Sequence, residues 1–296
     1  MAASDGVDLS AIVDRLCATP DLAERLVAHA DQELPARATV GRSVEGIRSA
    51  LFPGYFGLVY LGEGVRFHVA ALLEASLREL RRQAALAMRF VGRAERDAGP
   101  AIEQLLGRLP ELKRMLLLDV EAAYAGDPAA RSRDEAIFSY PGVQAIIFHR
   151  IAHELQLAEV PFIPRIISEE AHSATGIEIH PGAQIGERFF IDHGTGVVIG
   201  ETCEIGDRVR MYQNATLGAK SFALDPDGQP VKGIPRHPIV EDDVIIYSGA
   251  TILGRTRIGR GAIIGANAWV TRDVAAGALI TRRHGEDEDL RPDSKR

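Results

Sequence analysis

Residues 238–270 read PIVEDDVIIYSGATILGRTRIGRGAIIGANAWV, and this stretch decides the fold. An aliphatic residue recurs at every sixth position, at Val240, Ile246, Ile252, Ile258, Ile264 and Val270. The residue two positions before each of them is mostly small, and glycine often follows, as in Ile258-Gly259. A six-residue period is too short for a helical repeat and is typical of a parallel β-helix made of short strands and tight turns. The aliphatic residues should point inward, and each coil should bury its face against the next coil.

The same period runs earlier in the chain, from Ile179 to Ile191 and from Ile199 to Leu217. Together with residues 240–270, these stretches contain thirteen hexads. Three hexads make one coil, so we expect about four coils, above the roughly three repeats that a solenoid needs for stability.

The period breaks at two places. Ile191 and Ile199 are eight residues apart, and the extra residues fall in the segment 192–196, DHGTG. Leu217 and Val240 are twenty-three residues apart, which predicts a loop that leaves the coil. Insertions in solenoids map to exposed loops that carry function. The first break contains His193 and the second ends in Arg236 and His237, so both breaks are candidate parts of a functional site.

The first half of the chain has a helical pattern. A run without proline from residue 65 to residue 96 carries leucines at helical spacing, and Pro141 suits the first turn of a helix that reaches about residue 157. Pro100 and Pro110 are expected to separate shorter helices. The fold class is therefore α+β, with an all-helical domain over residues 1–165 followed by a β-helix over residues 166–275. Residues 276–296 are charged and are predicted to be a disordered tail.

Composition narrows the class of protein. The chain has 296 residues, 46% of them hydrophobic, and a formal charge of -7, which argues against a nucleic-acid binder. No apolar run is long enough for a transmembrane helix, and residues 1–14 do not resemble a signal peptide. Cys17 and Cys203 form neither a disulfide framework nor a metal motif. We therefore expect a cytoplasmic protein that binds no metal, no nucleic acid and no membrane.

His193 is the candidate general base, because an ordinary imidazole exchanges its proton near neutral pH. It lies between Asp192 and Gly194, away from any apolar core pattern. Glu178 precedes the inward-pointing Ile179, so its side chain should leave the opposite face of the strand, about one coil before His193. It is the candidate that orients the imidazole, and the alternative is a solvated glutamate.

Arg236 suits a substrate carboxylate, because a guanidinium binds a carboxylate through two parallel hydrogen bonds. The alternative is a solvated loop charge. His149 and His153 are four residues apart on a predicted helix, but they lack the His-Glu-x-x-His pattern of zinc enzymes, so we expect them to be structural. For His180, too, a structural role is the favoured interpretation.

Five segments together resemble the serine O-acetyltransferases of the hexapeptide-repeat acyltransferase family. They are IEIHPGA (177–183), IDHGTG (191–196), GETCEIG (200–206), TLG (216–218) and RHP (236–238). Hexads alone occur in many acyltransferases, whereas DHGTG followed by RHP is specific. The resemblance covers about residues 119–274. It implies a left-handed β-helix and trimers with active sites between neighbouring prisms, often paired into hexamers through the helical domain.

The resemblance also implies an activity, the transfer of acetyl from the cosubstrate acetyl-CoA to the hydroxyl of L-serine, which gives O-acetylserine for cysteine biosynthesis. It makes His193 the general base and Glu178, where many members have aspartate, its orienting partner. It implies serine-binding positions at Asp127, Asp192, Arg236 and His237. It implies an acetyl-CoA groove beside the backbone of Gly218, Ala219, Ala250 and Gly265.

Two alternative functions stay open. One is a hexapeptide-repeat O-acyltransferase that acts on a sugar or antibiotic hydroxyl. The other is a metal-binding β-helix trimer, which needs three converging histidines, and the spacing of His180, His193 and His237 does not match the short pair that such proteins use. Many serine acetyltransferases end in an isoleucine that docks into O-acetylserine sulfhydrylase. This chain ends in Arg296, so we do not expect that complex.

Overall fold

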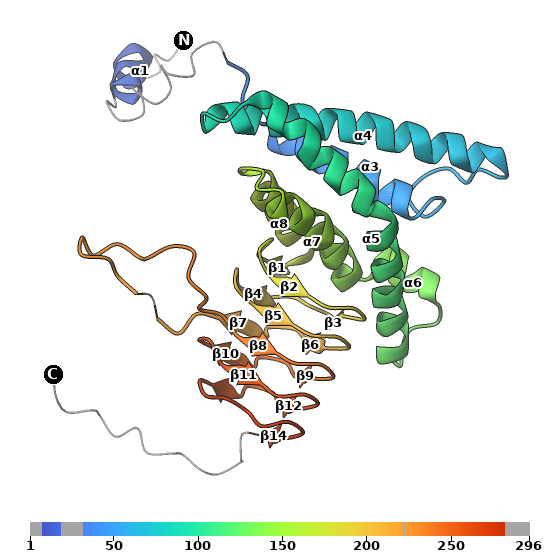
Figure 1. The fold of residues 1–296 in the computed structure, drawn as a ribbon, viewed down its shortest axis with the longest axis vertical. Helices are drawn as coiled ribbons and strands as arrows, with labels where there is room; N and C mark the ends of the chain where they lie inside the picture. The colour runs from blue at the N-terminus through green and yellow to red at the C-terminus, as the bar shows by residue number, and fades with distance from the viewer. Residues whose placement is uncertain (1–7, 19–31, 222, 282–296) are drawn as a thin grey trace, which may run out of the picture.

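A computed structural model describes residues 8–18, 32–221 and 223–281 (Figure 1). The helices in chain order are α1 (Leu9–Cys17), α3 (Arg37–Leu51), α4 (Glu63–Phe90), the 3-10 helix η1 (Glu95–Asp97), α5 (Ala98–Gly126), α6 (Arg133–Ser139), α7 (Pro141–Leu157) and α8 (Ile163–Thr175). Among the described residues, none of these helices combines the length and the apolar character that a membrane span requires.

The second half is the predicted parallel β-helix, with three sheets of short strands. Sheet A contains β1 (Glu178–Ile179), β4 (Val198–Ile199), β7 (Thr216–Gly218), β10 (Thr251–Leu253) and β13 (Trp269–Val270). Sheet B contains β2 (Gln184–Ile185), β5 (Glu204–Ile205), β8 (Ile239–Val240) and β11 (Arg257–Ile258). Sheet C contains β3 (Phe190–Asp192), β6 (Arg210–Tyr212), β9 (Ile245–Ile246), β12 (Ile263–Ile264) and β14 (Leu279–Ile280).

The hexad aliphatic residues form stacked columns inside the β-helix. In sheet A, Ile179 pairs with Ile199, and Leu217 pairs with Ile252. Leu217 and Ile252 are fully buried, and Ile199 is 1% exposed. Each column removes apolar surface from water coil by coil, which is why the period predicts the fold so directly.

The β-helix extends beyond the boundary predicted at residue 275. Sheets A and C have five strands and sheet B has four, so the β-helix has close to five coils rather than four. The last coil was missed because Val274 is out of step with the hexads, although it bridges to Ile258, and β14 follows. The remainder of the predicted tail, residues 282–296, lies outside the described residues.

The helical domain also differs from its predicted bounds. It continues to Thr175 rather than 165, because Pro164 lies in the first turn of α8, where a missing N–H is tolerated. Pro110 does not separate two helices but lies inside the continuous α5. An interior proline costs about 3 kcal/mol. The burial of Leu105, Leu109, Leu112 and Leu116 along one face of α5 offsets that cost.

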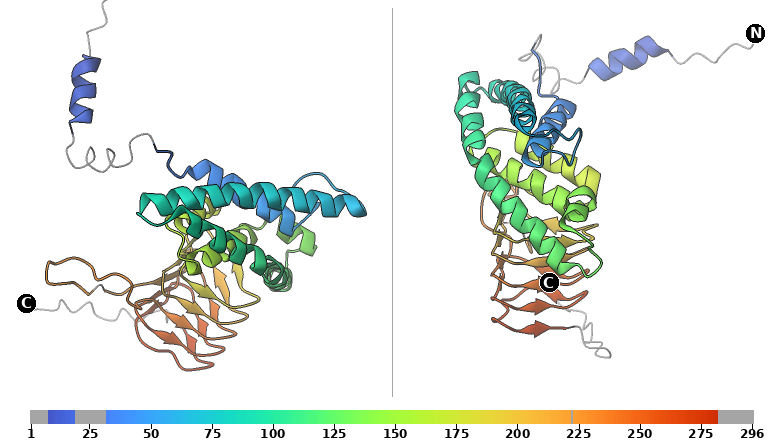
Figure 2. Two further views of the ribbon diagram at one scale, coloured as in Figure 1. Left: turned by 45° about the horizontal axis from the view of Figure 1, so that its top comes forward. Right: turned by 90° about the vertical axis from the view of Figure 1, so that its right-hand side faces the viewer.

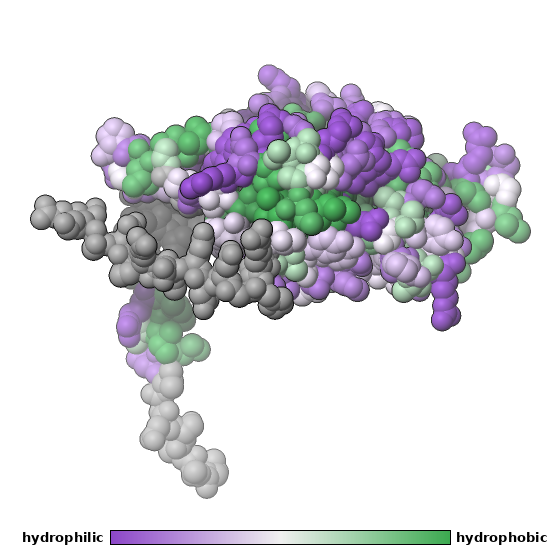
Figure 3. Space-filling view, turned by 90° about the horizontal axis from the view of Figure 1, so that it is seen from below, coloured by the Kyte–Doolittle hydropathy of each residue, from purple (hydrophilic) through white to green (hydrophobic). Residues whose placement is uncertain are grey.

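The helices stack on the N-terminal end of the β-helix, with α7, α8 and the C-terminal part of α5 against its first coil and α3 and α4 further out (Figures 1 and 2). At the opposite end, the last coil has no neighbour within the described residues. Figure 3 shows apolar residues gathered on this face. Trp269 and Leu279, both in the last coil, are 70% and 63% exposed.

Side chains of the helical domain satisfy backbone carbonyls at the start of the β-helix. In later coils, the equivalent carbonyls accept hydrogen bonds from the N–H groups of the preceding coil, as Val197 O does from Glu178 N. The first coil has no preceding coil, so its carbonyls need other donors. Instead, Ser168 Oγ donates to Ile179 O at 2.6 Å, and His153 Nδ1 lies 2.8 Å from Pro181 O. The helices thus cap the open end of the β-helix.

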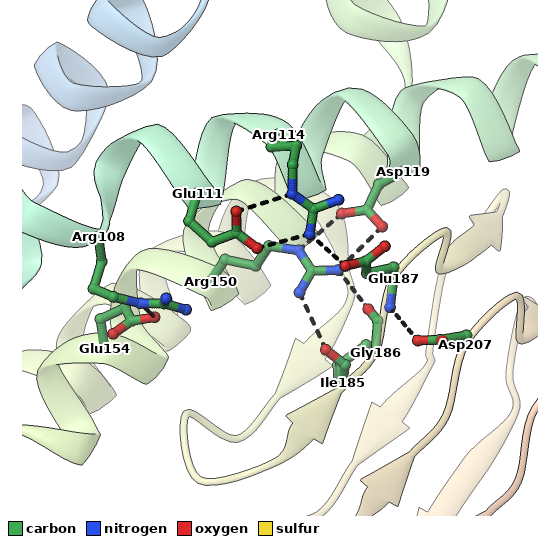
Figure 4. A network of polar contacts seen from close by, with 10 residues as sticks. All are labelled: Arg108, Glu111, Arg114, Asp119, Arg150, Glu154, Ile185, Gly186, Glu187 and Asp207. Atoms are coloured by element: carbon green, nitrogen blue, oxygen red, sulfur yellow. Dashed lines mark hydrogen bonds and ion pairs between the residues drawn. The ribbon is translucent and has the colours of Figure 1, made fainter.

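Arg150 caps two further carbonyls of the first coil (Figure 4). Its Nη1 and Nη2 donate to Ile185 O at 3.1 Å and to Gly186 O at 2.7 Å. The same guanidinium binds both oxygens of Asp119, at 2.8 and 3.0 Å, and the two side chains are 4% and 1% exposed. Burial raises the pKa of the Asp119 carboxyl, and the charge of Arg150 opposes this shift. This buried ion pair joins α5 and α7 to the first coil.

Candidate active site

Two of the three corners of the β-helix carry the predicted site residues. We call the turns that lead from sheet C to sheet A the C/A corner, and the turns from sheet A to sheet B the A/B corner. His193 lies on the C/A corner between β3 and β4, and Arg236 lies on the A/B corner between β7 and β8.

The break in the hexad period turns His193 outward. His193 has a φ of 58°, in the left-handed region, and its side chain is 70% exposed. Gly194 also has a positive φ, of 84°, and a Cβ there would overlap Ile177 Cδ1. The Nδ1 atom of His193 lies 3.7 Å from Asp192 Oδ1. The turn therefore requires a glycine beside the histidine and presents the imidazole to solvent next to a carboxylate.

Asp127 joins this histidine from the helical domain. It caps the C-terminus of α5, and its Oδ1 accepts a hydrogen bond from Ala129 N at 2.7 Å. Its Oδ2 accepts a hydrogen bond from the phenol of Tyr140. The hydrogen bond from Tyr140, followed by the one from Ala129 N and the nearby His193 imidazole, lowers the pKa of Asp127. The Asp127 carboxylate therefore stays ionised beside the exposed imidazole.

Two glycines let the helices approach β3 closely enough to form this cluster. A Cβ on Gly126 would lie 2.7 Å from Phe190 Cδ1, and a Cβ on Gly142 would overlap Ile191 O. Gly126 precedes Asp127, and Gly142 is the second residue of α7, directly after Tyr140 and Pro141. Close packing of α5 and α7 on β3 thus brings Asp127 and Tyr140 to the C/A corner. Asp192 is near enough that its charge contributes to raising the pKa of Tyr140.

Arg236 and His237 form a second cluster on the A/B corner. Arg236 Nη2 lies 2.7 Å from Glu201 Oε2, and its backbone N donates to Thr202 Oγ1 at 2.9 Å. His237 is 7% exposed, and its Nδ1 accepts a hydrogen bond from Thr202 N at 3.0 Å. Burial, and then the charge of Arg236, lowers the pKa of His237. The cluster therefore offers a positioned guanidinium beside a neutral imidazole.

His180 lies on the same corner, one coil above Glu201. Burial, followed by the charge of Arg165, lowers its pKa to about 4. Its Nδ1 accepts a hydrogen bond from Gly182 N at 3.0 Å. This partner lies within its own turn, and the charges of Glu201 and Arg236 on the same corner also act on His180.

Glu178 lies on sheet A, where it pairs with Val198. Within the described part of the chain, no hydrogen bond or ion pair joins its carboxylate to His193. The predicted orienting contact is thus not formed in this structure.

The four positions predicted for acetyl-CoA are divided between the same two corners. Gly218 and Ala219 lie where the chain leaves β7 on the A/B corner, and Ala250 and Gly265 lie on the C/A corner. Ala250 is fully buried and donates its N–H to Tyr247 O at 3.2 Å. Gly265 donates its N–H to Ile280 O at 2.7 Å. These two N–H groups are already used within the β-helix.

Sequence reasoning missed Tyr140 and Glu201. Glu201 belongs to the quoted segment GETCEIG, and its place one coil before Arg236 could have suggested the ion pair. Tyr140 directly precedes Pro141, but no local pattern signals its contact with Asp127, thirteen residues earlier. Over residues 8–18, 32–221 and 223–281, no group of three or more His, Cys, Asp or Glu side chains is placed to hold a metal ion.

Known proteins with similar sequences are acyltransferases. Residues 237–272 match the family model "Bacterial transferase hexapeptide (six repeats)". A plasmid-borne serine acetyltransferase of Synechococcus elongatus is 48% identical over 288 residues, which cover 93% of this chain and 90% of the relative. A serine acetyltransferase of Bacillus licheniformis is 53% identical over 161 residues, or 54% of this chain and 70% of the relative.

Solved structures with the same fold include serine acetyltransferase 1 of Entamoeba histolytica in complex with L-cysteine. It superposes with a TM-score of 0.75 at 36% identity, over 88% of this chain and 97% of that chain. The serine acetyltransferase of Neisseria gonorrhoeae in complex with serine has a TM-score of 0.55 at 26% identity, over 81% and 95% of the two chains.

Proposed function

Because the chain belongs to the serine acetyltransferases, we propose that it acetylates the hydroxyl of L-serine at a site shared by two chains, the C/A corner of one and the A/B corner of its neighbour. The observation that carries this proposal is the division of charge between the corners. Serine is a zwitterion, so its site needs an anion for the ammonium, a cation for the carboxylate and a base for the hydroxyl. The C/A corner has Asp127, Asp192 and His193, and the A/B corner has Arg236.

A ring of three chains would bring the two corners together. In a cyclic oligomer, each chain presents one surface to the next chain and a different surface to the previous one, so every interface joins a C/A corner to an A/B corner. We therefore propose a homotrimer, or a dimer of trimers. Light scattering should give a mass well above the 32.0 kDa of one chain, and a monomer at micromolar concentration would contradict the shared site.

The proposed reaction needs no acyl-enzyme. Arg236 holds the serine carboxylate in place of Glu201, and Asp127 and Asp192 receive the ammonium. His193 takes the hydroxyl proton while the serine oxygen attacks the thioester carbonyl of acetyl-CoA. The tetrahedral intermediate collapses, the C–S bond breaks, and the departing CoA thiolate takes the proton from His193. The products are O-acetylserine and CoA, and the imidazole returns to its neutral state.

Glu178 and the acetyl-CoA positions complete the proposal. Glu178 is proposed to orient His193 in the assembled enzyme, and Glu178→Gln should lower kcat by less than His193→Ala does. Acetyl-CoA is proposed to lie in the groove between the two corners, along the turns that contain Gly218, Ala219, Ala250 and Gly265. Since the N–H groups of Ala250 and Gly265 are occupied, those turns would supply contact surface rather than donors.

The test is the rate of CoA release with L-serine against a panel of sugar and aminoglycoside hydroxyls. We expect CoA release with serine only, and a chelator should leave the rate of release unchanged. A preference for a panel member would favour the acyltransferase alternative, and bound metal with no transferase activity would favour a metal-binding trimer. The cytoplasmic location remains a prediction.

A further inference from the structure

We propose that Tyr140 is a positioning residue that holds Asp127 in place to receive the ammonium of the substrate. The inference rests on the proposed function and assigns a new residue to the same site. Tyr140 comes from the start of α7 and Asp127 from the end of α5, so the contact joins two helices at the C/A corner.

The hydrogen bonds to Asp127 fix both of its oxygens. Oδ2 accepts from the Tyr140 phenol, and Oδ1 accepts from Ala129 N at 2.7 Å. A carboxylate whose two oxygens have separate fixed donors is confined in its torsion angles. Each oxygen still has a second lone pair for a ligand. Asp127 is thus oriented before any substrate arrives, which reduces the ordering cost of binding.

The surroundings of Tyr140 keep it a hydrogen-bond donor. Burial, then the hydrogen bond to Asp127 and the charges of Asp127, Glu135 and Asp192, raise the pKa of the phenol. A protonated phenol donates to the carboxylate without neutralising its charge. A lysine or arginine in the same place would neutralise it. The carboxylates at the C/A corner therefore keep their negative charge for an ammonium group. The contact favours an amino-acid substrate over a neutral alcohol.

Tyr140→Phe removes only the hydroxyl and leaves the ring. A matched control exists in Tyr55→Phe, because the Tyr55 phenol also donates to a carboxylate, that of Asp134, in the helical domain and outside the proposed site. In Tyr140→Phe, we expect the KM for L-serine to rise about tenfold, because a hydrogen bond to a charged group is lost. The KM for acetyl-CoA and kcat should change by less than about twofold, since neither depends on ammonium binding. Tyr55→Phe should match the wild type in all three constants.

A double-mutant cycle with Asp127→Asn shows whether the two residues act together. If Tyr140 acts through Asp127, adding Tyr140→Phe to Asp127→Asn should raise the serine KM by less than about twofold further. The inference is overturned if Tyr140→Phe behaves like Tyr55→Phe, if both Michaelis constants rise in parallel, or if the two changes are additive. Failure of the proposed function has a different signature, because the wild type would then release no CoA with serine.

Discussion

His193 and Arg236 lie on different corners of one β-helix, His193 in the turn between β3 and β4 and Arg236 between β7 and β8. Each has acidic residues beside it, Asp192 and Asp127 near His193, and Glu201 on Arg236. One chain therefore displays the proposed base and the proposed carboxylate ligand on separate surfaces. This division makes the proposed activity a property of the assembly.

Replacing His193 with alanine should lower kcat by about 10²–10⁴-fold, because the serine hydroxyl then has no base to remove its proton. Acetyl-CoA binding should stay near the wild-type value, and the acidic limb of the pH–rate profile should disappear. The control is His68→Asn, which changes a histidine of α4 that packs against Tyr60 in the helical domain, and this variant should keep the limb. Retention of most of the turnover by His193→Ala would make His237 or His180 the next candidate base.

Arg236→Lys should weaken serine binding more than acetyl-CoA binding. Lysine keeps the positive charge but cannot form the two parallel hydrogen bonds of a guanidinium. The loss should cost about 1.5–3 kcal/mol, measured as a higher KM for serine. Arg257→Lys is a suitable control, since Arg257 forms an exposed ion pair with Glu241. Equal changes in the two Michaelis constants would remove Arg236 from the serine site.

The regular part of the fold could be predicted from sequence because its cause is local. The period that places Leu217 and Ile252 inside the β-helix is visible residue by residue. The failures arise where tertiary packing outweighs a local signal. Pro110 remains inside α5 because the leucines on either side of it are buried, and the last coil forms although Val274 is out of phase.

Arg150→Met should reduce the free energy of unfolding by about 3–5 kcal/mol, because it leaves the buried carboxylate of Asp119 without its partner. The comparison is Arg114→Met. Arg114 binds Glu111 and Glu187 but is 47% exposed, so its loss should cost less than about 1 kcal/mol. Urea unfolding at one fixed protein concentration measures both. The double variant Arg150→Met, Asp119→Leu should recover part of the loss, and equal costs for the two single variants would contradict the role of this ion pair.

Acidification should destabilise the protein between about pH 6.5 and pH 4. His180 has a pKa of about 4 when folded and an ordinary value of 6.5 when unfolded, so in this range the unfolded chain binds more protons. The free energy of unfolding therefore falls as the pH falls. The lowered pKa values of His149 and His237 act in the same direction.

His180→Asn removes one of these groups, so its stability should fall less steeply than that of the wild type over the same range. Thermal unfolding from pH 8 to pH 4 measures the difference. Above pH 7 the imidazole is neutral in both states, and the gap between the two proteins should be constant there. Parallel curves down to pH 4 would show that His180 is not the group responsible.

The candidate site was only partly visible in the sequence, for a physical reason. His193 and Arg236 are marked by breaks in the hexad period, since a residue that leaves the coil interrupts the pattern. Tyr140 carries no such mark. Its contact with Asp127 exists because Gly126 and Gly142 let two helices pack against β3, and this packing has no local signature.

Co-assembly of two inactive variants tests the shared site most directly. His193→Ala retains an intact A/B corner, and Arg236→Ala retains an intact C/A corner. The two variants are co-expressed with different tags, mixed assemblies are confirmed by native mass spectrometry, and serine-dependent CoA release is measured. Random co-assembly at equal amounts should restore about a quarter of the wild-type rate, because one interface in four then joins two intact corners. Mixed assemblies that are no more active than either variant alone would contradict a site shared between chains.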